Sequence, residues 1–256
     1  MFARTNLCAV TLVTAAVTLT YAAPSYAATY TVNSLSNGIN DQPSTSLGVI
    51  GFDKDKPAPI VTGNGFYAKG DDNGGSNGDY TSVRFTAAAI GMSGLTLGQI
   101  TAVSYDAMNA IDGAKDWRFK VYTAPQTGQP ASAWFGVRVE APTTTSGTTY
   151  ETHNLVSYDR ITVGGTGGAN VYANADGTLP TDFTNLLTSS ANQLVMFFDI
   201  SAGAKSGGHD YETFLNNITI AASGFETATI TAVPEPTSIG LAAVAGLGLL
   251  ARRRRA

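Results

Sequence analysis

The amino-acid sequence predicts an all-β fold, an antiparallel β-sandwich, and three observations support that prediction. Short runs in which apolar and polar residues alternate recur along the chain. Clusters of Gly, Asn, Asp, Pro or Thr separate these runs, which is the pattern of strands joined by turns. The length of 256 residues, with 43% hydrophobic and 9% aromatic residues, supplies one sizeable core.

Eleven strands follow from this pattern. In chain order they are Thr29–Leu35, Gly48–Phe52, Ile60–Tyr67, Tyr80–Phe85, Ile100–Tyr105, Trp117–Tyr122, Ala133–Val139, Arg160–Val163, Leu194–Ile200, Phe214–Ala221 and Glu226–Thr231. Alternation is clearest in Trp117–Val121 and Phe135–Glu140, which we expect to cover the core on one face and meet water on the other. One short helix is predicted at Thr181–Ser189, where a threonine can cap the first turn.

The chain between Ala28 and Val233 is acidic. Arg4 and Arg252–Arg255 lie outside it, as does Glu235, so 10 of the 15 basic and 18 of the 19 acidic residues remain, a net charge of −8. Such a body repels phosphate backbones and anionic lipid, which argues against nucleic acid as a partner. The single cysteine, Cys8, also lies outside, so the body has no disulfide and no thiol nucleophile.

Residues 1–27 have the pattern of a secretory signal peptide. Arg4 precedes an apolar, Thr-rich run over Leu7–Tyr21, and the small residues Ser25 and Ala27 stand at the −3 and −1 positions before Ala28. The pattern predicts export, with cleavage between Ala27 and Ala28. The alternative is an uncleaved membrane anchor, for which the run is short.

Residues 233–256 combine three features in order. Pro234-Glu235-Pro236 comes first, the apolar stretch Ser238–Ala251 follows, and Arg252, Arg253, Arg254 and Arg255 stand before the last residue. A helix of the 14 apolar residues is roughly 21 Å long, shorter than the ~30 Å hydrocarbon core, and it inserts as a transmembrane helix if the arginines reach the headgroups. The arginines orient it with the body on the outer side of the membrane.

This order of features resembles the PEP-CTERM sorting signal of exported bacterial proteins. The resemblance implies recognition by an exosortase, an integral-membrane peptidase, with Pro234, Glu235 and Pro236 as the recognition residues. It further implies a protein that is transiently anchored in the inner membrane and then released or transferred to the cell surface or to the extracellular, exopolysaccharide matrix of a biofilm. A plain tail anchor is the alternative. The expected organisation is a signal peptide over 1–27, a β-sandwich domain over 28–232 and the sorting signal over 233–256.

The body resembles, more loosely, β-sandwich domains of the jelly-roll type, either concanavalin-like or galactose-binding-like. The likeness rests on Val103–Asp106, the strand Trp117–Thr123, and Phe214–Ile220. Such folds often bind sugars but also serve as structural modules, so the likeness does not settle the function.

One polar loop has the composition of a calcium site. Asp71, Asn73, Asn77 and Asp79 lie among glycines, and calcium takes six to eight oxygen ligands of this kind. No glutamate closes the loop as in an EF-hand. The alternative is an ordinary polar hairpin loop.

Three aromatic residues are candidates for carbohydrate binding: Trp117, Tyr122 and Trp134. A pyranose face can stack on such rings. Because aromatic side chains also supply much of the buried area of a sandwich, the alternative is that each belongs to the core.

The sequence carries no recognisable catalytic motif. The body's histidines are His153 and His209, without a Gly-x-Ser-x-Gly elbow or the spacing of a zinc hydrolase. Its four glutamates do not form a Glu-x-Asp-x-x-Glu pattern, although a carboxylate pair assembled from distant strands stays open. We expect a non-catalytic exported protein of the cell surface or exopolysaccharide matrix, with a lectin-like module and a polysaccharide-active enzyme as alternatives. The expected partners are signal peptidase, exosortase and exopolysaccharide; no cofactor is expected, with calcium as the alternative.

Overall fold

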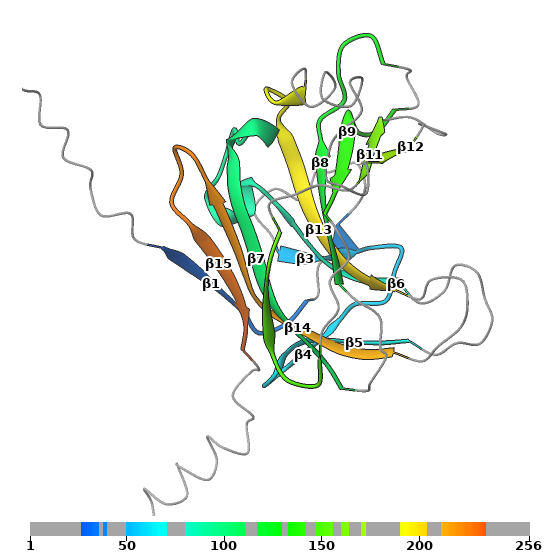
Figure 1. Ribbon diagram of the computed structural model, residues 1–256, viewed down its shortest axis with the longest axis vertical. Helices are drawn as coiled ribbons and strands as arrows, with labels where there is room; N and C mark the ends of the chain where they lie inside the picture. The colour runs from blue at the N-terminus through cyan, green and yellow to red at the C-terminus, as the bar shows by residue number, and fades with distance from the viewer. Residues whose placement is uncertain are drawn as a thin grey trace, which may run out of the picture.

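Two β-sheets packed face to face form the body of the protein (Figure 1). The computed structural model describes residues 27–35, 38–39, 50–70, 80–110, 117–129, 133–141, 147–155, 160–163, 170–172, 190–203 and 211–233. The elements are β1 (Ala28–Val32), β2 (Gly38–Ile39), β3 (Ile50–Asp53), β4 (Ile60–Thr62), β5 (Gly65–Gly70), β6 (Tyr80–Thr86), η1 (Ala88–Ile90), η2 (Leu97–Gln99), β7 (Ile100–Asn109), β8 (Trp117–Thr123), β9 (Val137–Glu140), β10 (Glu151–Asn154), β11 (Arg160–Val163), β12 (Asn170–Tyr172), β13 (Val195–Gly203), β14 (Tyr211–Ala222) and β15 (Ala228–Ala232). The predicted all-β class is confirmed.

The smaller sheet has seven strands built around β14. Strands β15 and β5 pair with successive parts of β14, β1 and β4 extend the sheet beyond them, and β7 and then β10 follow on the other side. The larger sheet has eight strands in the order β12-β11-β9-β8-β13-β6-β3-β2. Two pairs depart from the predicted antiparallel arrangement, because β1 runs parallel to β15 and β2 runs parallel to β3.

The core lies between the sheets and is rich in aromatic side chains. Phe66, Phe85 and Phe119 are among the largest fully buried residues, and burying such a side chain stabilises a fold by roughly 1.5–3 kcal/mol. Two buried hydrogen bonds join the sheets. Tyr105 Oη donates to the carbonyl of Trp117 (2.8 Å), and Trp117 Nε1 donates to Thr213 Oγ1 (3.0 Å). These bonds satisfy polar groups that burial would otherwise penalise.

All eleven predicted strand segments contain strand, and the differences lie at their ends and between them. Ile60–Tyr67 divides into β4 and the start of β5, because the chain turns at Gly65, whose φ of 123° favours glycine. The structure adds β2, β10 and β12; β10 escaped notice because its residues are polar and mostly exposed, without apolar alternation. The sandwich type, jelly-roll or otherwise, stays a prediction.

The structure does not test the predicted helices or the predicted signal peptide. The helix at 181–189, the transmembrane helix at 238–251 and the signal peptide up to residue 26 all lie outside the described residues. Among the described residues, no helix is long and apolar enough to cross a membrane.

Candidate functional site

The outer face of the larger sheet carries five charged side chains in register, which we call the charge row. From β6 to β11 these are Arg84, Asp199, Lys120, Glu140 and Arg160, one from each of five neighbouring strands. The signs alternate along the row. Alternation along each strand produces this placement, because the residues on either side of the row point into the core.

Asp199, the second member of the charge row, is a buried anion. Its Oδ2 lies 2.7 Å from Arg84 Nη2 and 3.0 Å from Arg84 Nε, and its Oδ1 lies 3.8 Å from Lys120 Nζ. Arg84 Nη2 also reaches Asp53 Oδ2 at 2.9 Å. Burial alone raises the pKa of Asp199, but the charges of Lys120 and Arg84, with hydrogen bonds from Arg84 and Ser201, outweigh it and hold that pKa below its usual value.

Glu140 is the second buried anion, and three guanidinium groups converge on it. Its Oε2 lies 2.8 Å from Arg118 Nη1 and 3.2 Å from Arg160 Nη1, while its Oε1 lies 2.9 Å from Arg138 Nε. The carboxylate itself is only 3% exposed. Both oxygens of Glu140 are therefore engaged by cations.

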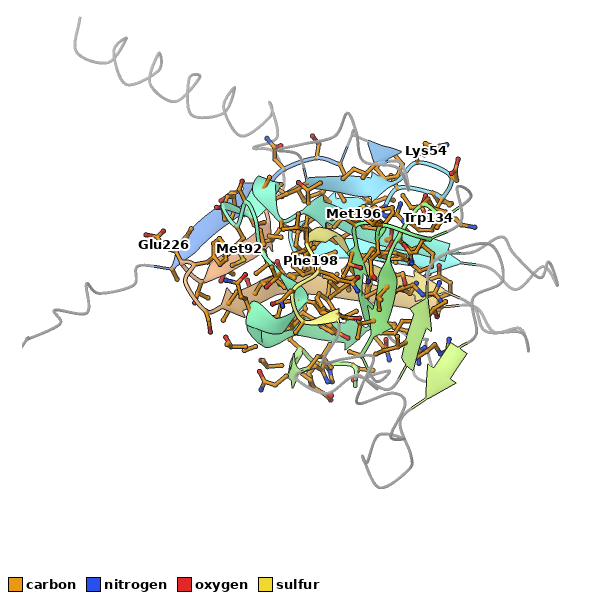
Figure 2. The ribbon with its side chains drawn as sticks, turned by 90° about the horizontal axis from the view of Figure 1, so that it is seen from above. Lys54, Met92, Trp134, Met196, Phe198 and Glu226 are labelled. Carbon is orange, nitrogen blue, oxygen red and sulfur yellow. The ribbon has the colours of Figure 1, made fainter. Side chains whose placement is uncertain are left out.

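An aromatic cluster adjoins the charge row on the same face. Tyr122 stacks on Phe197 with ring centroids 4.5 Å apart and on Trp134 at 5.3 Å, and Phe135 meets Tyr122 edge-on at 5.7 Å. Arg84 joins the two features, because its Cζ lies 4.8 Å from the centre of the Phe197 ring, a cation–π contact. Burial raises the pKa of Tyr122, which keeps its hydroxyl neutral. In Figure 2, Trp134 and Met196 lie close together at the margin of this cluster.

The three predicted carbohydrate-binding residues lie in two places. Trp117 belongs to the core between the sheets, whereas Tyr122 and Trp134 belong to the aromatic cluster. Trp117 is completely buried between the sheets and offers no ring face to a sugar, so the core alternative holds for it. The structure brings Tyr122 and Trp134 together in the aromatic cluster. Tyr122 is 5% exposed, whereas Trp134 is half-buried and forms the accessible end of the stack.

The predicted calcium ligands Asp71, Asn73, Asn77 and Asp79 lie outside the described residues, as does His209. His153 lies on β10, with its Nε2 3.9 Å from Glu151 Oε2. Within the described ranges, no group of three or more His, Cys, Asp or Glu side chains could hold a metal ion.

The sorting end of the body is a strand pair. The amide of Ala28 donates to the carbonyl of Thr227 (2.8 Å), and the amide of Val233 donates to the carbonyl of Val32 (2.8 Å), so β1 holds β15 along its whole length. Ala27 is exposed directly ahead of β1. Pro234, Glu235, Pro236 and the terminal arginines lie outside the described residues.

Comparison with protein families finds a match at the C-terminal end of the sequence. Residues 232–255 match the PEP-CTERM protein-sorting motif. The motif implies an exported protein that is anchored in the membrane before it reaches the surface, and it implies exosortase as the processing partner. In particular, the chain contains a PEP-CTERM sorting motif in its last 25 residues. No curated protein matches the chain, and no solved structure matches it.

Sequence reasoning missed the charge row as a unit. Its members lie up to 115 positions apart, as Arg84 and Asp199 do. A partial signal was visible in the alternation of charged with apolar residues in Trp117–Val121 and Phe135–Glu140, which identifies an outer face. The order of the strands, which decides whose charges meet, was not visible.

Proposed function

We propose that this is a non-catalytic protein of the cell surface or exopolysaccharide matrix, sorted and processed at its C-terminus by an exosortase. The observation that carries the proposal is the PEP-CTERM motif at residues 232–255, which begins at the last residue of β15. Because β15 pairs with both β14 and β1, the sorting motif is joined directly to a folded sheet. Processing at the motif would therefore deliver the whole sandwich to its destination.

The charge row supports a non-catalytic role. A general acid needs a carboxyl group whose pKa is raised toward the working pH. Asp199 has the opposite environment, and Glu140 is surrounded by Arg118, Arg138 and Arg160. Lys120 stands between the two carboxylates in the row. This arrangement joins strands through ion pairs. It is less suited to the catalysis that a polysaccharide-active enzyme would need.

The sorting proposal is tested by replacing Arg252–Arg255 with glutamine. We expect loss of retention in the inner membrane and loss of C-terminal processing, because the arginines stop and orient the apolar segment. Cell fractionation and mass spectrometry of the mature C-terminus measure both. Lys54→Gln with Lys56→Gln, which removes two cations from the surface of the body, is the matched control. A quadruple variant processed as well as the parent would refute the sorting role.

A lectin-like module is the second candidate, and the half-buried Trp134 favours it. Its ring lies 5.3 Å from Tyr122 and nearly parallel to Phe197, with an interplanar angle of 6°. A sugar ring could stack on the outer side of this column. Calcium bound by the loop at residues 71–79 stays a separate proposal, which chelation tests through a lower melting temperature.

A further inference from the structure

The outer face of the smaller sheet bears a row of apolar side chains that its strand order aligns. Ile60 on β4, Tyr67 on β5, Phe214 on β14 and Met108 on β7 are successive partners in register. Ile60 is 61% exposed, and the rings of Tyr67 and Phe214 lie 5.0 Å apart. Four adjacent strands make a row roughly 14 Å long. We call these four residues the apolar row.

Tyr150 extends the apolar row from the β10 side. This tyrosine is 41% exposed, and a methyl group built on Gly65 would come within 3.1 Å of its hydroxyl, so the side chain lies across the outer face toward β5. Burial, with a smaller contribution from Asp106, raises the pKa of Tyr150 to about 12. The phenol therefore remains a neutral hydrogen-bonding group at physiological pH. Exposed aromatic side chains gathered on one face of a soluble domain commonly mark an interaction site.

A second row, the polar row, runs beside the apolar row and is joined by hydrogen bonds. Thr231 Oγ1 donates to Asn217 Oδ1 (3.2 Å), Asn217 Nδ2 donates to Asp106 Oδ2 (2.6 Å), and Thr152 Oγ1 donates to Asp106 Oδ1 (2.7 Å). These four residues come from β15, β14, β7 and β10. Asp106 and Phe214 belong to adjacent rungs of the same face, because Asn216 pairs with Asp106 and Phe214 pairs with Met108.

A β-bulge in β14 sets the position of Asn217. The register with β7 shifts between Asn216 and Thr219, and Asn217 has a φ of 47°, the one positive value at a non-glycine residue in the described ranges. Asn216 Oδ1 accepts hydrogen bonds from the amides of Asn217 (2.9 Å) and Ala232 (3.0 Å), which compensates for the interrupted ladder. Bulges and left-handed residues of this kind re-aim side chains and concentrate at functional sites.

We propose that this face binds a neutral polysaccharide, with the pyranose rings against the apolar row and their hydroxyls on the polar row. The proposal rests on the proposed function for the source of the ligand, the matrix around the cell. Sugar rings offer apolar C–H faces and a rim of hydroxyls, which match an aromatic row beside threonine, asparagine and carboxylate groups. Lipid would cover the polar row without offering hydrogen bonds to the polar atoms that these residues present to solvent in addition to their mutual bonds.

The charge of the face selects a neutral polymer over an anionic one. Asp106 is an anion within the polar row, and the nearby Lys69 is paired with Glu212 at 2.6 Å. The chain between Ala28 and Val233 has a net charge of −8. An anionic polysaccharide would meet repulsion from both sources.

Affinity electrophoresis tests the proposal. The full chain, purified in mild detergent, is run in native gels containing dextran, glucomannan or a β-1,3-glucan, with alginate as the anionic comparison. We expect retardation by at least one neutral polymer and none by alginate. The double variant Tyr67→Ala, Tyr150→Ala should weaken binding about tenfold or more, because two ring contacts are lost. Leu194→Ala removes a 53% exposed apolar side chain directly before β13 of the opposite sheet, outside both candidate sugar sites, and is the control.

Asn217→Gly separates binding from folding. Glycine adopts a positive φ without strain, so this variant removes the amide while keeping the bulge. We expect a melting temperature close to that of the parent together with binding weakened several-fold, since one hydrogen-bonding group of the polar row is lost. Asn217→Ala, which removes the same amide and also strains the backbone, should lower the melting temperature further.

Four results would overturn the proposal. The first is no retardation by any of the three neutral polymers, and the second is equal weakening by Leu194→Ala and the double variant. The third is unchanged binding by Asn217→Gly, and the fourth is a dimer of the parent that Tyr150→Ala dissociates. The double variant should still be sorted and processed in cells, and the variant lacking Arg252–Arg255 should still bind polysaccharide. Failure of binding and failure of sorting are therefore distinguishable.

Discussion

Individual residues of the larger sheet show how a β-sandwich accommodates buried charge. The Asp199 side chain is 3% exposed, and the ion pairs with Arg84 and Lys120 stabilise its charged form. Isolated burial of such an anion would be very costly, whereas removal of one member of a buried pair leaves its partner uncompensated. The charge row is therefore sensitive to single substitutions at either sign.

We expect Asp199→Asn to lower the free energy of unfolding by roughly 3–5 kcal/mol, because Arg84 would lose its closest anion. Chemical denaturation measures the change. Asp55→Asn is the control, since Asp55 pairs with Lys54 at the surface and should cost less than about 1 kcal/mol. A similar effect of the two substitutions would contradict the interpretation of the row.

The loss of stability caused by Asp199→Asn should depend on pH in one direction. The pKa of Asp199 lies below its unfolded value of about 3.9. Its carboxylate therefore contributes stability above that value, and the contribution is lost as the pH falls through the folded pKa. The stability difference between parent and variant should be constant near neutrality and shrink in strong acid. A difference that grew on acidification would contradict this assignment.

Among the strands, β1 covers a sheet edge although it is only five residues long. By pairing with β15, the strand that leads into the sorting motif, β1 satisfies the backbone groups along the side of β15 that faces away from β14. An uncovered edge would expose backbone hydrogen-bonding groups to other chains. The bonds at Ala28 and Val32 face β15, and in a parallel ladder alternate residues bond the same neighbour, so the amide of Tyr30 also faces β15 while that of Thr31 faces away.

Proline substitutions test this pairing. Tyr30→Pro should lower the melting temperature relative to Tyr30→Ala by several degrees, since proline removes a ladder hydrogen bond and leaves a carbonyl of β15 unpaired. Thr31→Pro should differ little from Thr31→Ala. Thermal melts followed by circular dichroism compare the four variants. Equal proline effects at the two positions would show that β1 does not pair with β15 as described.

On the scale of the whole molecule, the smaller sheet pairs strands from the two ends of the body. The first strand after the predicted cleavage site, β1, pairs with the last strand before the sorting motif, β15. The core residues of both sheets lie between Val32 and Ala232. The folded unit thus coincides with the segment that remains when both predicted terminal signals are removed.

We expect residues 28–233 to fold alone as a soluble, mainly β monomer. About 200 residues can bury roughly 70% of the surface that the unfolded chain exposes, which suffices for independent stability. Because Cys8 lies outside this segment, folding should proceed equally in a reducing cytoplasm. Circular dichroism and sedimentation measure the outcome. A strongly helical spectrum, or one without a cooperative melt, would contradict the two-sheet fold.

The sequence by itself determined the class of fold and the presence of the sorting motif. Alternation in Trp117–Val121 identified both a strand and its inner face, because side chains of a strand point alternately to its two sides whatever the partner strand. The sorting motif at residues 232–255 is likewise a contiguous signal. Both depend on neighbours in the sequence.

Tertiary structure alone decided which distant residues meet. The sequence contains Arg84, Asp199 and Glu140 as unrelated charges, and only the order of β6, β13, β8 and β9 places them in one row. The apolar and polar rows of the smaller sheet arise in the same way, with the bulge at Asn217 adding an irregularity that alternation does not predict. The physical reason is that strand order and register are set by non-local pairing and core packing, whereas alternation is a local property of the chain.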